Sequence, residues 1–192
     1  MNHNLKLTSY RSATLILLLG LCLPITPLRA QFFTSAAMSD SGTSTFTVNV
    51  AADQEITDVN FRLSIQHDDV YLISAVLVSP LGTRVSLFNG GLGVNGANLQ
   101  DTFLDDQASN GSIGSTGFQT PPYADTYKPN QHGDPPFFGL NYSLSTFNGE
   151  QSAGTWTLEL NDNVADGFIG QLLGQNAGAP WGTAAGRSRC CG

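Results

Sequence analysis

Three aspartates within six residues are the side chains of this sequence best suited to hold a cation. Asp101, Asp105 and Asp106 fall in the stretch "DTFLDDQA". Closely spaced carboxylates and backbone carbonyls are the oxygen ligands that Ca²⁺ takes in proteins. The same carboxylates could instead cap turns by accepting backbone N–H bonds. Both interpretations stay open at this point, and the EF-hand pattern is absent because the alternating ligands and the closing glutamate are missing.

The histidines do not suggest a nucleophilic triad. His67 and His132 are the only histidines after the first thirty residues, and no Gly-x-Ser-x-Gly segment accompanies them. We expect His67 at the solvated end of a strand, hydrogen-bonded to the backbone, and His132 in a solvated loop. The sequence therefore predicts a chain without a catalytic centre of its own.

The first thirty residues have the pattern of a secretory signal peptide. Lys6 and Arg11 precede the apolar run "ATLILLLGLCL", and "TPLRAQ" follows. The apolar run is shorter than the roughly 20 residues that span a bilayer. We expect cleavage after Ala30, with Ala37 as the alternative. A lipoprotein site at Cys22 is disfavoured because bulky Leu21 precedes it. The chain is predicted to be secreted, extracellular or periplasmic, with no membrane attachment after cleavage.

The remaining chain is strongly acidic. All fifteen Asp and Glu residues lie beyond residue 30, against five Lys and Arg, which gives a net charge of −10. The few basic residues do not cluster, so nucleic acid is excluded as an expected partner. Two adjacent cysteines at 190 and 191 cannot build a disulfide framework. The core must therefore come from side-chain packing.

Alternating apolar residues predict several short β-strands. "FTVNV" (46–50), "VNFRLSIQ" (59–66), "RVSLFN" (84–89) and "TWTLEL" (155–160) alternate. "YLISAVLVSP" (71–80) is nearly continuously apolar, which predicts a central strand covered on both faces. Such strands with glycine-rich connections predict an all-β sandwich or barrel. Residues 90–147 are rich in Gly, Pro, Asn and Ser. Six aromatic residues within 118–142 favour ordered loops there over disorder, namely Phe118, Tyr123, Tyr127, Phe137, Phe138 and Tyr142.

Five segments, in order, resemble the P domain (P/Homo B domain) of kexin- and furin-like proprotein convertases of the subtilisin family. They are "ITDVNFRLSIQH", "AVLVSPLGTRVSLF", "DTFLDDQA", "ADTYKP" and "LSTFNGEQSAGTWTLELNDNVADGFIGQL". The resemblance implies a jelly-roll β-sandwich of the galactose-binding-domain-like type. It also implies a non-catalytic module that accompanies a subtilisin-like serine endopeptidase and modulates its stability and calcium response.

Two departures from the family pattern affect these expectations. The tail "LGQNAGAPWGTAAGRSRCCG" replaces the last strand of the family, so we expect the Trp156 strand to lose a neighbour and expose an edge. Tyr71, Leu72 and Ile73 stand where the family commonly has Gly-Asp-Leu, so no metal role is assigned to Asp68 or Asp69.

The expected organisation is a signal peptide over 1–30, an extension with a first strand over 31–55, a P-domain-like unit over 56–173 and an irregular tail over 174–192.

The leading functional hypothesis is a secreted accessory or protein-binding module linked to subtilisin-like serine proteolysis. Its expected partner is a subtilisin-like protease domain or another secreted protein, and its expected metal is Ca²⁺ at Asp101, Asp105 and Asp106. The alternative is a calcium-dependent carbohydrate- or matrix-binding jelly roll. An unrecognised hydrolase is a third hypothesis.

Overall fold

The computed structural model describes residues 33–51, 53–90, 96–114, 121–130 and 139–174. The signal-peptide prediction, His132, Phe118, Phe137, Phe138 and most of the tail lie outside these residues. Among the described residues there is no α-helix, and none of the helical turns there is long and apolar enough to cross a membrane. The chain is therefore all-β in the part that the structure describes, as its alternating sequence predicts.

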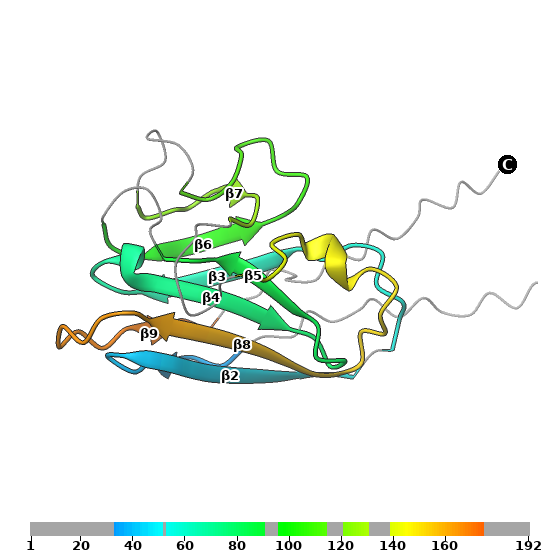
Figure 1. Ribbon diagram of the computed structural model, residues 1–192, viewed down its shortest axis with the longest axis horizontal. Helices are drawn as coiled ribbons and strands as arrows, with labels where there is room; N and C mark the ends of the chain where they lie inside the picture. The colour runs from blue at the N-terminus through cyan, green and yellow to red at the C-terminus, as the bar shows by residue number, and fades with distance from the viewer. Residues whose placement is uncertain (1–32, 52, 91–95, 115–120, 131–138, 175–192) are drawn as a thin grey trace, which may run out of the picture.

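The described residues form two sheets (Figure 1). The first has the order β1-β9-β3-β6-β7, and the second has the order β2-β8-β4-β5. Among the strand pairs of the described residues, only the short β6–β7 pair is parallel. The elements in chain order are β1 (Ala36–Ala37), β2 (Gly42–Val50), β3 (Phe61–Gln66), the 3₁₀ turn η1 (Val70–Leu72), β4 (Ile73–Val78), β5 (Arg84–Phe88), β6 (Leu99–Leu104), β7 (Thr126–Tyr127), the 3₁₀ turn η2 (Leu144–Phe147), β8 (Gly154–Asp162) and β9 (Gln171–Leu172).

Side chains from both sheets form one core. Phe61 on β3, Leu77 on β4 and Trp156 on β8 are each at most 1% exposed. These residues follow the period of two, so one face of each strand points between the sheets. The β-sandwich prediction is confirmed at this level, whereas the jelly-roll and galactose-binding-domain assignments stay predictions.

The continuously apolar segment forms an inner strand, as predicted. β4 pairs with β8 on one side and with β5 on the other. Ile73, Ala75 and Leu77 are buried on one face, and Ser74 and Val76 are buried on the other. Burial on both faces explains why this stretch does not alternate.

The expectation of an open edge on the Trp156 strand is wrong. β8 lies between β2 and β4, and its register with β2 runs without interruption from Gly42↔Asp162 to Val50↔Gly154. The missing partner is thus a strand near the start of the chain, and within the described part of the chain the sheet ends at β2. Short β9 follows β8 and pairs with β1 and β3 in the other sheet.

The glycine-rich region between 90 and 147 contains a strand that alternation did not reveal. β6 pairs with β3, but its register shifts between Leu63↔Thr102 and Ile65↔Leu99. Two residues of β6 therefore face one residue of β3, which is a β-bulge. Asp101 in the bulge has a φ of 53°. Tyr123 and Tyr127 are buried, as expected for ordered loops, whereas Tyr142 is 48% exposed.

Candidate functional site

The bulge separates Asp101 from the other two predicted metal ligands. Asp101 Oδ2 lies 2.9 Å from Arg62 Nη2 in a salt bridge across the β3–β6 pair. Its backbone N–H donates to Ser64 Oγ at 2.8 Å. A cation at Asp101 would therefore have to displace a guanidinium group that already neutralises the carboxylate.

Asp105 and Asp106 act as turn caps in this structure. Asp105 Oδ1 accepts the backbone N–H of Gln107 at 2.7 Å. Asp106 anchors the distant turn η2, because its carboxylate accepts the N–H groups of Leu144 and Ser145 at 3.0 and 2.8 Å and the hydroxyl of Ser143 at 2.6 Å. The contacts of these two carboxylates are therefore those of turn caps, which is one of the two interpretations that the sequence left open.

A third carboxylate that the sequence did not single out lies near Asp105 and Asp106. Burial raises the pKa of the Asp58 carboxyl, and the negative charges of Asp105 and Asp106 raise it further, against a hydrogen bond from Asn60. The acidic group is therefore Asp58, Asp105 and Asp106, without Asp101. Among the described residues no set of three His, Cys, Asp or Glu side chains has the arrangement of a metal site. Calcium binding stays a prediction.

The expectation of a solvated His67 is wrong, because its side chain is fully buried at the end of β3. His67 Nε2 lies 3.2 Å from Asp162 Oδ2, and both side chains are 0% exposed. On the other side of the ring, Nδ1 lies within hydrogen-bond distance of the backbone of Asp69, 2.9 Å from its carbonyl oxygen and 3.1 Å from its nitrogen. The expected backbone hydrogen bond is present, but it lies in the interior.

Asp162 is held in place by two donors. Its Oδ1 accepts the N–H of Val164 at 3.1 Å, and its Oδ2 faces His67. Burial raises the pKa of the Asp162 carboxyl, and these two hydrogen bonds offset part of that rise. Since both ring nitrogens of His67 are engaged and the ring is shielded from water, His67 has no free nitrogen with which to activate a nucleophile.

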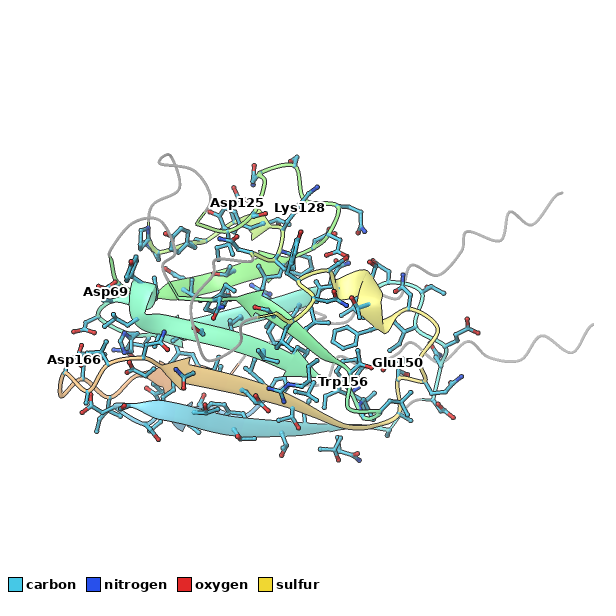
Figure 2. All side chains as sticks on the ribbon, in the orientation of Figure 1. Asp69, Asp125, Lys128, Glu150, Trp156 and Asp166 are labelled. Atoms are coloured by element: carbon cyan, nitrogen blue, oxygen red, sulfur yellow. The ribbon has the colours of Figure 1, made fainter. Side chains whose placement is uncertain are left out.

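The His67–Asp162 pair fixes one end of the sandwich. We call this surface the η1 end, formed by residues 66–72 and by the β8–β9 connection 163–170. The two parts are joined where Asn163 N–H donates to Leu72 O at 3.1 Å and where the Phe168 ring lies edge-on to His67 with centroids 5.1 Å apart. Asp40 Oδ1 accepts the N–H of Gly167 at 2.8 Å. Figure 2 shows Asp69 and Asp166 at this same end.

Apolar and acidic side chains are exposed together at the η1 end. Tyr71, Val164 and Ile169 are 41%, 42% and 63% exposed. Asp68 and Asp166 are exposed beside them, and residues 66–72 and 163–170 contain no Lys or Arg. Apolar side chains rimmed by charges of one sign are typical of a protein-binding surface, with a partner that is apolar and basic.

The surface also has two small depressions, of which the second borders the η1 end at Gln66. One, of about 160 Å³, is lined by Asp106, Ser112, Lys128, Pro129, Tyr142 and Ser143. The other, of about 220 Å³, lies over the β3–β6 bulge and is lined by Ser64, Ile65, Gln66, Asn98, Leu99, Gln100 and Leu173. Both are smaller than the roughly 300–1,000 Å³ of ordinary small-molecule sites. The second is rich in neutral amide groups, which suit a neutral polar ligand.

The chain is similar to part of two solved structures. No protein-family model and no curated protein matches the chain. Among solved structures it is similar to the serine protease of Aeromonas sobria, with 16% identity and a TM-score of 0.39 over 78% of this chain and 27% of that one. It is also similar to the Aeromonas sobria serine protease in complex with the chaperone ORF2, with 16% identity, a TM-score of 0.36 and coverage of 79% and 28%. The chain thus spans under a third of the length of these proteins.

Proposed function

We propose that this chain is a secreted, non-catalytic P-domain-like module that binds and stabilises a subtilisin-like serine protease domain. The proposal rests on the five motif segments and on where they lie in the sandwich. "AVLVSPLGTRVSLF" forms β4, its turn and β5, and the closing segment contains η2, β8 and β9. The aspartate of "DTFLDDQA" that anchors η2 is Asp106. These three motifs therefore coincide with strands of the sandwich or with a contact that anchors one of its turns.

The η1 end is the surface that we assign to the protease. Its exposed Tyr71, Val164 and Ile169 offer apolar contact area, and the surrounding carboxylates favour a basic partner surface. The buried His67–Asp162 pair holds the two contributing segments in a fixed relation. A preformed surface loses less conformational freedom on binding than a mobile one.

The test uses a purified subtilisin-like catalytic domain from the same source and calorimetric titration with this chain. We expect binding, together with a longer half-life of the protease at elevated temperature. The double variant Tyr71→Ser/Ile169→Ser should weaken binding at least tenfold. The matched control is Leu81→Ser, because Leu81 is 72% exposed and lies in the β4–β5 turn, at the other end of β4. A protease that neither binds nor gains stability would contradict the proposal.

A second candidate function, carbohydrate binding, is favoured by the amide-lined depression over the bulge. Gln66, Asn98 and Gln100 present donors and acceptors that match sugar hydroxyl groups. Binding on a glycan array that is lost in Gln66→Ala/Gln100→Ala would support this function. Loss of the same binding on chelation would further support its calcium-dependent form.

A further inference from the structure

The outer strand β2 is long, and among the described residues no strand pairs with it along one side. It pairs with β8 over nine residues, and it is the last strand of its sheet (Figure 1). Natural proteins usually protect such an edge with a charge, a proline, a bulge or a covering segment. The sequence "GTSTFTVNV" contains no charge and no proline, and its register has no bulge.

The other sheet edges are protected in the part of the chain that the structure describes. β5, at the opposite edge of the same sheet, is partly covered where Asn141 bridges to Val85 and accepts the N–H of Ser86 at 2.7 Å. The edge strands of the other sheet, β1 and β7, have two residues each. Long unprotected pairing capacity is therefore specific to β2.

The unused hydrogen-bonding capacity of β2 lies in its backbone. In an antiparallel pair, alternate residues direct their N–H and C=O groups toward the partner strand, and the residues between them direct theirs away. Of nine residues, four or five therefore point their backbone groups away from β8. Phe46, at the midpoint, is only partly buried although it packs against the core. An added strand would satisfy the backbone groups and cover this ring.

We propose that β2 pairs with β2 of a second copy of this chain, antiparallel and two-fold symmetric about Phe46. Phe46 then lies opposite its own counterpart, and Thr45 lies opposite Thr47 of the second copy. Aromatic pairs and Thr–Thr pairs are favourable across antiparallel strands. An isologous contact of this kind closes on itself, so it gives a dimer with no further open edge of this length in the described residues.

A second copy can pair along this strip in spite of the overall negative charge of the chain, because the strip itself is uncharged. The chain carries a net charge of −7, so two copies repel each other over most of their surfaces. The strip 42–50 is free of charge, and pairing about Phe46 brings no two like charges together. The inference is independent of the proposed protease partner, which we assign to the η1 end.

The test compares the mass of the purified chain in solution with that of edge variants, by analytical ultracentrifugation over a range of protein concentrations. The wild-type chain should reach twice the mass of a single chain. Thr45→Lys/Thr47→Lys should remain monomeric, because each lysine then faces a lysine of the second copy. The matched control, Thr155→Lys/Thr157→Lys, adds the same charges to the same face on β8, one strand away from the edge, and should still dimerise.

A charge-swap experiment shows whether the lysine variant stays monomeric because of charge repulsion between the two copies. Mixing Thr45→Lys/Thr47→Lys with Thr45→Glu/Thr47→Glu should restore a dimer that contains one copy of each, since every cross-strand pair then becomes Lys–Glu. Circular dichroism verifies that each variant is folded. A wild-type chain that stays monomeric at high micromolar concentration would overturn the proposal, and so would a dimer that survives the lysine pair or a mixture that fails to associate.

Discussion

His67 Nε2 lies 3.2 Å from Asp162 Oδ2 in the interior of the sandwich, where β3 and β8 both reach the η1 end. The two residues are 95 positions apart in the chain; His67 directly follows β3 of one sheet, and Asp162 is the last residue of β8 in the other. A buried polar pair of this kind contributes most through the cost of leaving one partner unsatisfied.

Replacing Asp162 is therefore expected to destabilise the fold in a graded way. Asp162→Ala removes the acceptor of both His67 and the Val164 N–H and should cost about 3 kcal/mol in the free energy of unfolding. Asp162→Asn retains an acceptor for Val164 and should cost about 1 kcal/mol. Urea denaturation followed by circular dichroism measures both. Equal losses in the two variants would show that the hydrogen bonds are not the origin of the effect.

The charged Asp58 carboxylate should destabilise the folded protein at neutral pH and should cease to do so at low pH. Burial and the nearby charge of Asp105 raise the pKa of Asp58 above its ordinary value of 3.8. The folded state thus holds this proton more tightly than the unfolded state does. The resulting stability is present below pH 3.8 and is lost as the pH rises through the folded-state pKa.

Asp58→Asn should accordingly stabilise the protein at pH 7, by less than about 1 kcal/mol because the side chain is partly exposed. The advantage over wild type should vanish as the pH falls toward 4. Thermal unfolding across this pH range measures the difference. Asp53→Asn, at an exposed position outside the acidic group, is the control. A stabilisation of the same size at every pH would contradict the assignment.

Calcium is expected to raise the melting temperature if it binds near Asp105 and Asp106. A ligand that binds only the folded state at 100 times its Kd adds about 2.7 kcal/mol to stability. Differential scanning calorimetry in excess Ca²⁺, in excess Mg²⁺ and with chelator tests this, and Asp105→Asn should reduce the shift. An unchanged transition in Ca²⁺ would remove the metal site from consideration.

Trp156 should be the most costly single truncation in the core. It is 1% exposed, its ring lies edge-on to Phe147 at 5.1 Å, and its Nε1 donates to Ser152 O at 2.9 Å. Trp156→Ala should cost about 3–5 kcal/mol, through the lost contacts and the cavity that remains. Trp156→Phe keeps part of the ring volume and should cost about 2 kcal/mol. Chemical denaturation gives both values, and a loss below 1 kcal/mol for the alanine variant would argue against this packing.

The local sequence pattern was sufficient to predict several of the strands, but it did not predict how they pair. The alternation of Phe61, Leu63 and Ile65 follows from burial of one face, and the structure confirms it. The pairing of β2 with β8 was missed because Thr43 and Asn161 are 118 residues apart, and no local signal reports such a contact. β6 was missed because its bulge at Asp101 breaks the period of two.

The candidate site was the harder prediction. Clustered aspartates suggested a metal site, but the bulge turned Asp101 toward Arg62, and Asp106 instead anchors η2. His67 followed a strand whose polar residues were expected to face water, and only the distant Asp162 makes its burial favourable. Residue type and spacing thus identified several of the polar side chains of interest but not their partners.

The position of β8 has a consequence for how the chain can acquire its structure during synthesis. β8 separates β2 from β4, so the second sheet cannot assemble until residues 154–162 have left the ribosome. Until then, the early β2 segment has no native neighbour. Assembly of the β2–β8–β4 part of this sheet is therefore a late event in the synthesis of the chain.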